Sequence, residues 1–507
     1  MSAQTGRFDT TDSDTLLGQS PALIAVLAHV LIWSLGPALV FGNLHSDTLE
    51  AAYWGRDLAL GYAKHPPATT WLVDATLRLG VSPIASLMFL SQAGMAMASF
   101  FVWKSVRLYA SAQTAGLAVL LFLLAPAATL YAVQLNHNSL LSPFWAATLY
   151  FCLAYLEERR WLHAIGLGIA AGLGMLVKYE IVLLLVPLVA LAVIAPRFRS
   201  AFAQPASYVS IGLFFLILAP HVWWLEANNW PSAARAMGAE KMRNVATLNL
   251  SAVNAIVGLF ALFFVPVALL FATLGRRVSD DIARGPDLSL IALVIAFGPP
   301  ATLVASSVAT LQIVKPLWVL PLASSVAVGL ALMFPAGSGG LGFGERASAR
   351  LLMALSALLF AAFVGYLIVA GALGKPLAAF AADARKLSVE IERVWGARQT
   401  GPLRCVVISD RKIGASGVLF VPGRPDFVDF SSPSWSTPRQ IGECRRSGAI
   451  AALTEASSAL DHCPAACRAD VTRFEVSPLP GMGKAKWPVE LVYIPPEAAA
   501  GCAAPAR

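Results

Sequence analysis

Long apolar runs separated by short polar loops fill most of this chain. A helix that crosses a membrane needs about 20 mostly apolar residues. Eleven runs approach this length, and we predict a membrane span in each: 22–44, 84–103, 114–132, 139–156, 162–177, 179–195, 206–225, 252–274, 288–310, 315–334 and 350–373. We divide the stretch 162–195 at Lys178, because it is too long for one span.

After Leu373 the pattern changes. Apolar residues recur at helical spacing over 376–395 and predict an amphipathic connector helix; they are Leu377, Phe380, Ala384, Leu387, Ile391 and Val394. Short apolar runs between Gly, Pro and Ser predict strands at Cys405–Ser409, Gly417–Val421 and Glu490–Ile494. The sequence therefore predicts an N-terminal tail (1–21), a transmembrane domain (22–374), a connector (375–399) and a small α/β domain (400–507).

Composition supports this division. Only 13% of the residues are charged, whereas a soluble chain averages about 25%. The mean hydropathy of +0.67 also indicates an all-α polytopic membrane protein. The net charge of +8 does not indicate a nucleic-acid partner, because Lys and Arg on cytoplasmic loops account for most of it.

Lys and Arg gather on alternate loops, which predicts a cytoplasmic N-terminus and an outer C-terminus. The basic residues are Lys104, Arg107, Arg159, Arg160, Arg197, Arg199, Arg276, Arg277, Arg284, Arg346 and Arg350. The polar, acid-containing first residues do not form a cleavable signal peptide, so we expect the first apolar run to remain as an anchor.

Cysteines support an outer C-terminal domain. Cys152 lies alone in an apolar run, whereas Cys405, Cys444, Cys463, Cys467 and Cys502 cluster near the C-terminus. This clustering fits an oxidising compartment and one or two disulfides, whose pairing the sequence leaves open. A metal site at Cys463 and Cys467 is a weaker interpretation, because no second ligand pair accompanies them.

The loop 43–83, between the first two spans, carries the main candidate chemistry. Asp47 and Glu50 are three residues apart and share a face of a helical turn. A carboxylate beside hydrocarbon, with a raised pKa, suits a general base that takes a proton from an acceptor hydroxyl. The alternative is a pair of solvated acids. Pro66 and Pro67 open a predicted interfacial helix that carries Trp71, Ala75 and Leu79.

Other polar groups lie in loops of the same predicted face. Lys178 and Tyr179 interrupt an apolar run, and Lys178 either meets a phosphate or extends its stem to the interface. Asn136, His137 and Asn138 form a short turn, where Asn138 either faces the outer cavity or caps a helix. His221 either binds substrate or belongs to an interfacial aromatic belt. Lys64, Lys241 and Lys315 are weaker candidates for binding phosphate.

No Walker loop, dinucleotide fingerprint or H-E-x-x-H motif is present. An enzyme active on the outer face has no nucleotide sugar or ATP available. A lipid-linked phosphate sugar is therefore the reasonable donor for a transferase there.

These motifs resemble a known family. Ser46-Asp47-x-x-Glu50-x-x-Tyr53-Trp54, Leu60-Gly61-Tyr62-x-x-His65-Pro66-Pro67, the stretch 140–185, Ala219-Pro220-His221-Val222-Trp223-Trp224 and Trp318-x-x-Pro321 occur in that order. Over residues 20–335 the chain resembles bacterial GT-C-fold transferases of the dolichyl-phosphate-mannose–protein mannosyltransferase-like superfamily. That superfamily includes aminoarabinose lipid A transferases and rhizobial lipopolysaccharide galacturonosyltransferases.

The resemblance implies a glycosyltransferase of the bacterial inner membrane that uses a polyprenyl-phosphate sugar on the periplasmic face. The implied acceptor is a lipid A or lipopolysaccharide, another glycan or a protein. Asp47 would be the catalytic carboxylate, with Glu50 as the second acid. The predicted donor- and substrate-binding residues are Tyr53, Lys64, His65, Asn136, His137, Asn138, Lys178, Tyr179, His221 and Lys315.

Two departures from the family pattern matter. Many relatives have adjacent acids before the Tyr, whereas here Asp47 and Glu50 are separated, and Asn138 stands where many relatives carry an acid. Which acid acts as base therefore stays open. Metal use varies in the family, so a divalent cation is a possible cofactor with no assigned ligands.

Two other classes of function remain. A transporter or flippase of lipid-linked sugars would typically show internal repeats and midplane charges. Here the charges lie at one face and no repeat is visible. A non-catalytic membrane partner is the third class, and the two departures leave room for it.

Overall fold

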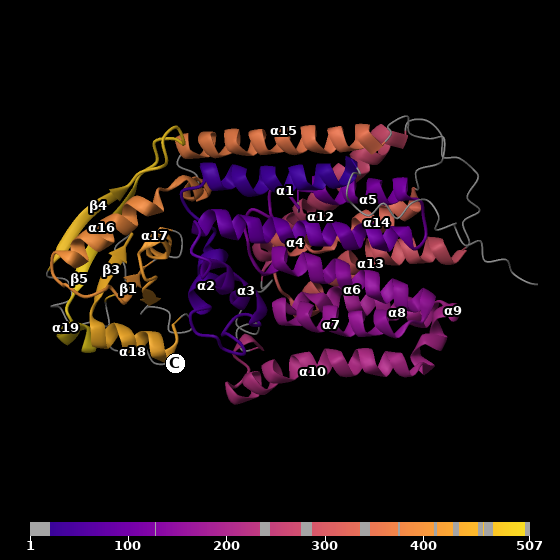
Figure 1. Ribbon diagram of the computed structural model, residues 1–507, viewed down its shortest axis with the longest axis horizontal. Coiled ribbons are helices and arrows are strands. Elements are labelled where there is room, and N and C mark those ends of the chain that lie inside the picture. Colours follow the sequence, from indigo (N-terminus) through magenta and orange to yellow (C-terminus); the bar gives the residue numbers. More distant parts are fainter. Residues whose placement is uncertain are drawn as a thin grey trace, which may run out of the picture.

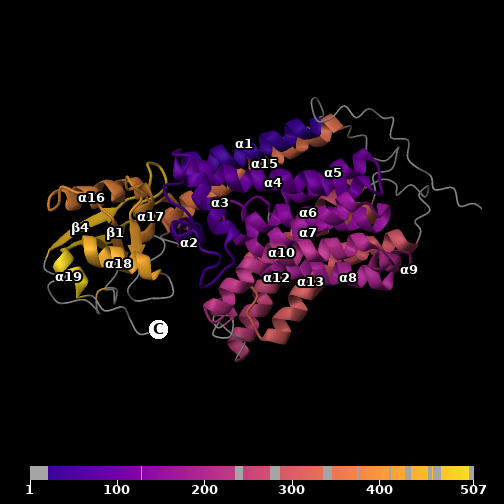
Figure 2. The ribbon, with the colours of Figure 1, turned by 60° about the horizontal axis from the view of Figure 1, so that its bottom comes forward.

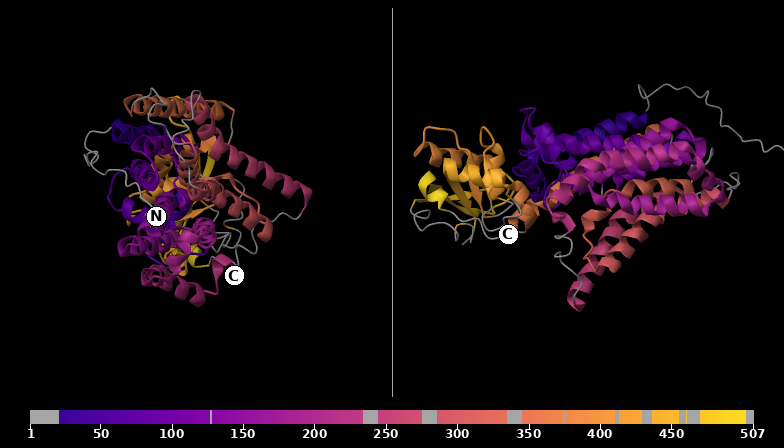
Figure 3. Two further views of the ribbon diagram at one scale, coloured as in Figure 1. Left: turned by 90° about the vertical axis from the view of Figure 1, so that its right-hand side faces the viewer. Right: turned by 90° about the horizontal axis from the view of Figure 1, so that it is seen from below.

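The computed structural model describes residues 21–126, 128–233, 244–274, 286–334, 345–373, 376–409, 413–428, 436–454, 460 and 470–501. A bundle of helices, most of which run along its long axis, forms the larger part, and a small domain around a sheet lies at one end of it (Figure 1). Two further views keep the sheet domain at that end (Figures 2 and 3). The predicted combination of an all-α membrane part and a small C-terminal α/β domain is confirmed.

Every predicted span contains a helix. The long ones are α1 (Pro21–Val40), α4 (Pro83–Arg107), α6 (His137–Glu158), α10 (Pro205–Ala227), α12 (Val245–Leu274), α13 (Pro286–Thr310) and α15 (Glu345–Ala372). The shorter ones are α5 (Ala112–Leu124), α7 (Trp161–Val177), α8 (Val182–Ile194) and α14 (Leu322–Met333). Within the described residues, six helices are long and apolar enough to cross a membrane, or seven if one bent pair counts as a span. The figure of eleven spans therefore stays a prediction.

Several boundaries differ from the prediction. The third predicted span is shorter, because α5 ends at Leu124. The segment that begins at Lys315 first forms a short 3-10 helix, η3 (Pro316–Val319), before α14 begins at Leu322. The break at Lys178 is confirmed: the backbone there is extended between α7 and another 3-10 helix, η1 (Tyr179–Ile181).

Helices pack closely where small residues face a neighbour. A Cβ on Gly168 of α7 would lie 2.4 Å from the Ser210 carbonyl oxygen of α10. A Cβ on Gly329 of α14 would lie 2.6 Å from the Ala296 Cβ of α13. Such close backbone approach is typical of helix pairs in membranes, where van der Waals packing drives association.

The loop after α1 forms α2 (Ser46–Trp54) and α3 (Ala68–Leu77), which lie between the bundle and the sheet domain (Figure 1). The predicted helical turn carrying Asp47 and Glu50 is confirmed. The helix opened by Pro66 and Pro67 is confirmed as well, although it ends before Leu79.

The connector is not one helix. A 3-10 helix, η4 (Pro376–Ala381), comes first, and α16 (Ala384–Gly396) follows. The side chain of Asp383 accepts a hydrogen bond from the Lys386 N–H and caps α16. Asp383 also donates its backbone N–H to Ser477 in the sheet domain, so the chain must bend at this point. Phe380, Ala384, Leu387, Ile391 and Val394 of the predicted apolar seam are buried.

The sheet has the order β2-β1-β3-β5-β4. Its strands are β1 (Cys405–Ile408), β2 (Asp426–Val428), β3 (Ala449–Leu453), β4 (Val471–Val476) and β5 (Trp487–Ile494). β1 pairs parallel with β2 and β3, and β5 pairs antiparallel with β3 and β4. The parallel strands are buried along their whole length, as a sheet covered on both faces requires.

The predicted strand Gly417–Val421 is wrong, because this run belongs to the helix α17 (Gly414–Phe420). It connects the parallel strands β1 and β2, and such a crossover is usually helical. The other helices of the domain are α18 (Pro438–Ser447) and α19 (Pro496–Ala500). A disulfide joins Cys405 to Cys444 of α18. Cys463, Cys467 and Cys502 lie outside the described residues.

The described basic loops lie at the end of the bundle away from the sheet domain. There α9 (Pro196–Arg199) and a 3-10 helix, η2 (Ser200–Ala203), connect α8 to α10 (Figure 1). The basic loops thus lie at the opposite end of the bundle from the loop that contains α2 and α3, which agrees with the predicted alternation of loops. The orientation in a membrane stays a prediction.

Candidate active site

Sequence-distant polar segments meet at the end of the bundle that faces the sheet domain. They are α2, residues 60–65, the start of α6, the break between α7 and α8, and the end of α10. Most of the predicted site residues belong to these segments.

Lys64 joins the two carboxylates of α2. Its Nζ lies 3.3 Å from Glu50 Oε2 and 3.8 Å from Asp47 Oδ1. His45, at the start of α2, accepts a hydrogen bond from the Asp47 N–H and places its Nδ1 3.9 Å from Asp47 Oδ2. The Asp47 side chain is 33% exposed and that of Glu50 only 2%. Asp47 is therefore the carboxylate that a substrate can reach.

The expectation of a raised pKa is wrong for Asp47. Burial by itself raises the pKa of this carboxyl, but the basic groups His45, Lys64, His137 and Lys178 together lower it below its ordinary value. Asp47 is consequently ionised at neutral pH and available as a proton acceptor.

The turn before α6 packs against α2. Thr48 donates its hydroxyl to the Leu135 carbonyl oxygen at 2.5 Å. Asn136 caps α6 and forms a capping box with Ser139. The residue that caps the helix is thus Asn136, and the predicted alternative role of Asn138 as a cap is wrong.

His137 follows Asn136 and is buried. Its ring lies 3.8 Å from the ring of His65, measured between centroids. Among the described residues, its Nε2 has no hydrogen-bond partner. The pair brings the two predicted histidines together beside Lys64.

Lys178 is buried between three groups. Its Nζ donates to Asn138 Oδ1 at 2.6 Å and lies 2.5 Å from Glu180 Oε1. The same Nζ lies 5.7 Å from the centre of the Trp318 ring, within the range of a cation–π contact. The ammonium therefore stays inside the protein and does not extend to the interface.

His221 connects three segments. Its Nδ1 lies 2.7 Å from the Leu60 carbonyl oxygen, which can only accept, so Nδ1 carries the proton. Its Nε2 then accepts a hydrogen bond from the Tyr179 hydroxyl at 2.8 Å. Next to it, Trp224 leaves no room for a side chain at Gly61, where a Cβ would lie 2.3 Å away. Because His221 is buried, the interpretation as an interfacial belt residue is wrong.

Two predicted residues are not joined to this cluster by their contacts. Tyr53 packs its ring on Phe427 of the sheet domain, with centroids 3.6 Å apart. Lys315 is exposed at the start of η3, and its backbone carbonyl accepts from the Trp318 N–H. Their roles in binding stay predictions. Lys241 lies outside the described residues.

The structure adds residues that sequence reasoning did not select. His45 and Thr48 flank Asp47, Glu180 pairs with Lys178, and Trp318 lies over the same ammonium. A signal existed for Glu180, which lies two residues after Lys178 in the same apolar run. Within the described residues, no three His, Cys, Asp or Glu side chains are grouped to hold a metal ion, so a divalent cation has no assigned ligands.

Comparison with known proteins gives related sequences. The family model described as dolichyl-phosphate-mannose-protein mannosyltransferase matches residues 64–224. The lipopolysaccharide core galacturonosyltransferase RgtA of Rhizobium johnstonii is 25% identical over 421 residues, which are 77% of this chain and 79% of that protein. The lipid A galacturonosyltransferase RgtD of the same organism is 24% identical over 180 residues, 35% of this chain and 37% of that protein.

Solved structures give the fold. ArnT from Cupriavidus metallidurans in its apo state has a TM-score of 0.58 at 12% identity, covering 95% of this chain and 98% of that one. The same protein bound to undecaprenyl phosphate has a TM-score of 0.57 at 12% identity, covering 93% and 97%. At this identity the likeness establishes the shared fold.

Proposed function

We propose that this chain is a GT-C-fold membrane glycosyltransferase of the dolichyl-phosphate-mannose–protein mannosyltransferase-like superfamily, and that it transfers a sugar from a polyprenyl-phosphate donor to an acceptor of the bacterial envelope. The observation that carries the proposal is the cluster at the sheet-domain end of the bundle. There the accessible carboxylate of Asp47 lies beside Lys64, and Lys178 is buried nearby. ArnT with bound undecaprenyl phosphate supports a polyprenyl donor.

The proposed reaction is a direct displacement with inversion. The oxygen of an acceptor hydroxyl attacks C1 of the sugar and forms the new C1–O bond. The bond between C1 and the phosphate oxygen breaks, and its electron pair leaves with the polyprenyl phosphate. The hydroxyl proton passes to Asp47, which is ionised and is the more exposed carboxylate.

The cations of the cluster act on the leaving group. Lys64 and Lys178 place positive charge where the phosphate gains negative charge during the displacement, and this stabilises the transition state. Glu50 and Glu180 hold the two ammonium groups in position at 3.3 and 2.5 Å. We assign the reaction to the periplasmic face, in agreement with the predicted topology.

The names of two relatives support a proposal for the sugar and the acceptor. Both Rhizobium proteins are named galacturonosyltransferases, one for the lipopolysaccharide core and one for lipid A. We therefore propose a uronic acid as the transferred sugar and a lipopolysaccharide or lipid A as the acceptor. The many basic groups around Asp47 fit a donor that carries a carboxylate in addition to its phosphate.

The test is transfer by the purified full-length protein. Polyprenyl-phosphate donors carrying a uronic acid, a neutral hexose or an aminopentose are each mixed with lipid A and core lipopolysaccharide, and products are identified by mass spectrometry. We expect a uronosylated glycolipid, and no product with Asp47→Asn. Product from another donor alone would replace the proposed sugar. Movement of the lipid-linked sugar across liposomes, with no covalent product from any donor, would favour the transporter.

A further inference from the structure

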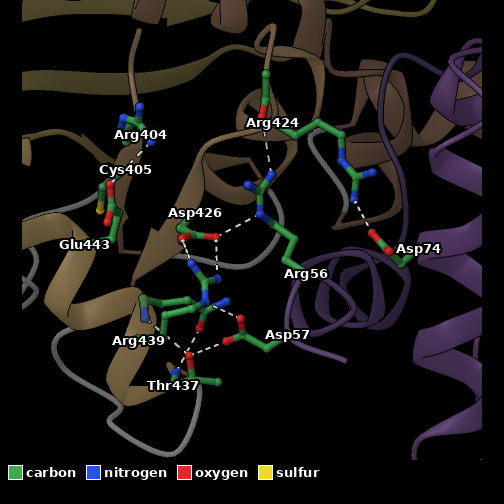
Figure 4. A network of polar contacts seen from close by, with 12 residues as sticks. Arg56, Asp57, Asp74, Arg404, Cys405, Arg424, Asp426, Thr437, Arg439 and Glu443 are labelled. Atoms are coloured by element: carbon green, nitrogen blue, oxygen red, sulfur yellow. Dashed lines mark hydrogen bonds and ion pairs between the residues drawn. The ribbon is translucent and has the colours of Figure 1, made fainter. Parts of the chain in front are cut away.

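The segment that follows α2 is bound to the sheet domain by an array of alternating charges (Figure 4). Arg56 Nε lies 2.8 Å from Asp426 Oδ1. Arg439 contacts both oxygens of Asp426, at 2.8 and 3.1 Å, and its Nε binds Asp57. Thr437 donates its hydroxyl to Asp57 at 2.5 Å. The loop therefore contributes two charged members to the array, and the sheet domain contributes two charged members and the Thr437 hydroxyl.

Regular elements of the sheet domain carry the array's partners for the loop. The carboxylate of Asp426 is 3% exposed, so both of its oxygens depend on the two guanidinium groups. Asp426 begins β2, and its N–H is fixed by the Arg404 carbonyl oxygen at the edge of the sheet. Thr437 caps α18 in a capping box with Gln440, and Arg439 lies in the first turn of that helix. Asp426 and Arg439, which bind the loop, thus both belong to regular elements of the sheet domain.

Contacts beside the array extend the interface. Phe427 stacks on Tyr53 in the last turn of α2. Arg424 binds Asp74 of α3 at 3.0 Å and reaches the Ala52 carbonyl oxygen of α2 at 3.5 Å. The run 424–427 therefore contacts both helices of the catalytic loop. Figure 4 shows Arg424 beside Asp74 of α3, and Asp426 beside Arg56, which follows α2.

The same helix carries the proposed catalytic carboxylate. Asp47 lies in the first turn of α2, and the sheet domain binds Arg56 and Asp57 just after the last turn of this helix. At a rise of about 1.5 Å per residue, Asp47 and the last residue of α2, Trp54, are separated by roughly 10 Å of continuous helix. A displacement of its end is thus carried to Asp47, and a misplacement of about 1 Å can cost on the order of 100-fold in rate.

We propose that Asp426 and Arg439 of the sheet domain are positioning residues for the transferase reaction, which they serve by fixing α2 through Arg56 and Asp57. This proposal rests on the proposed function. The sheet domain is accordingly a part of the catalytic apparatus. It contributes no reacting group, and its contact with the loop sets the place of Asp47.

The experiment compares Arg439→Gln, Asp57→Asn and the double variant in the full-length protein. We expect each single variant to lower kcat at least about 10-fold with the donor KM little changed, because the carboxylate is misplaced and the donor site is kept. The double variant should lose less than the product of the two single losses, since Arg439 and Asp57 share a contact that either change breaks. The control is Lys486→Met, which removes an exposed ion pair with Glu475 inside the sheet domain and should leave kcat within about 2-fold.

Hydrogen exchange of the amides in α2 gives a readout that does not depend on activity. Faster exchange over residues 46–54 is expected in Arg439→Gln and not in Lys486→Met. If Arg439→Gln yields no folded protein, Arg439→Lys replaces it, because Lys keeps the charge and loses the two-pronged contact.

The outcomes separate this proposal from the proposed function. If the wild-type protein is inactive but Arg439→Gln still speeds hydrogen exchange in α2, the proposed transferase function is wrong and the structural role of the contact stands. Unchanged kcat and unchanged exchange in Arg439→Gln overturn the positioning role. A raised acceptor KM at constant kcat also overturns it, because the domain would then bind the acceptor.

Discussion

Asp47 and Glu50 differ in environment although they stand on the same helix. Asp47 is partly exposed and surrounded by basic groups, whereas Glu50 is buried and paired with Lys64. The accessible carboxylate of Asp47 is suited to accept a proton from a substrate hydroxyl, and the buried carboxylate of Glu50 is suited to hold Lys64. This difference gives the two acids separate roles and leads to two predictions.

The first prediction compares isosteric changes. Asp47→Asn should lower kcat by about 100-fold to 10,000-fold, the usual contribution of a positioned base. Glu50→Gln should retain more activity and mainly raise the donor KM, because Lys64 loses a partner. Steady-state kinetics together with binding of a labelled donor measure both effects. Normal turnover in Asp47→Asn combined with an inactive Glu50→Gln would exchange the two roles.

The second prediction concerns pH. Burial raises the pKa of Asp47, and the charges of His45 and Lys64 are among those that lower it. Removing Lys64 removes a lowering influence, so the pKa rises and the carboxylate is protonated at higher pH. In Lys64→Met the acid limb of the kcat/KM profile should therefore move to higher pH than in the wild type. Lys104→Met, at the opposite end of the bundle, is the control; an unmoved limb in Lys64→Met contradicts the assigned base.

At the scale of elements, close packing between the loop and α10 holds Lys64 near α2. Gly61 touches Trp224, and the Leu60 carbonyl oxygen accepts from His221 of the same helix. These contacts fix the start of the segment that leads to Lys64 and His65. The position of the predicted donor site therefore depends on α10 as well as on the loop.

The third prediction uses this contact. In Gly61→Ala the new Cβ would lie 2.3 Å from Trp224 Cε3, so the loop or α10 must shift. We expect a loss of about 1–3 kcal/mol in stability, the usual cost of overpacking, and a lower kcat/KM. Gly212→Ala in α10 is the matched control, because nothing lies within 4 Å of its Cβ position. Thermal unfolding in detergent and donor kinetics check the result, and equal behaviour of both variants would exclude the packing argument.

At the scale of the whole molecule, the two ends of the bundle differ in chemistry. The described basic loops lie at one end, and Asp47, Glu50, the histidine pair His65 and His137, and the sheet domain with its disulfide lie at the other. Positive charge favours the cytoplasmic side and disulfides favour an oxidising compartment. Both signals favour an outer location for the end that carries Asp47, and this orientation stays a prediction.

The fourth prediction tests this orientation in cells. Alkaline phosphatase, which folds only in an oxidising compartment, should be active when fused after Gly501 and inactive when fused after Arg199. Full-length expression of each fusion is checked by immunoblot. Activity only in the Arg199 fusion would reverse the topology and move the proposed reaction to the cytoplasmic face.

Local patterns in the sequence determined the helical bundle, the break at Lys178, the helical turn carrying Asp47 and Glu50, and the separate C-terminal domain. Each depends on hydropathy, charge or spacing within a few turns, and these local properties do not depend on the rest of the chain. The tertiary structure decided the contacts. Lys178 meets Asn138 across 40 residues, His221 meets Leu60 across 161, and Arg439 meets Asp57 across 382.

The errors follow the same division. The pKa of Asp47 depends on how many cations the fold gathers around it, and the run Gly417–Val421 is helical because it connects parallel strands. Neither the cations around Asp47 nor the pairing of the strands that α17 connects can be identified from the residues next to them in the sequence. Sequence thus determined which chemical groups the outer loop carries, and only folding decided which of them meet, because each such contact joins segments that are distant in the chain.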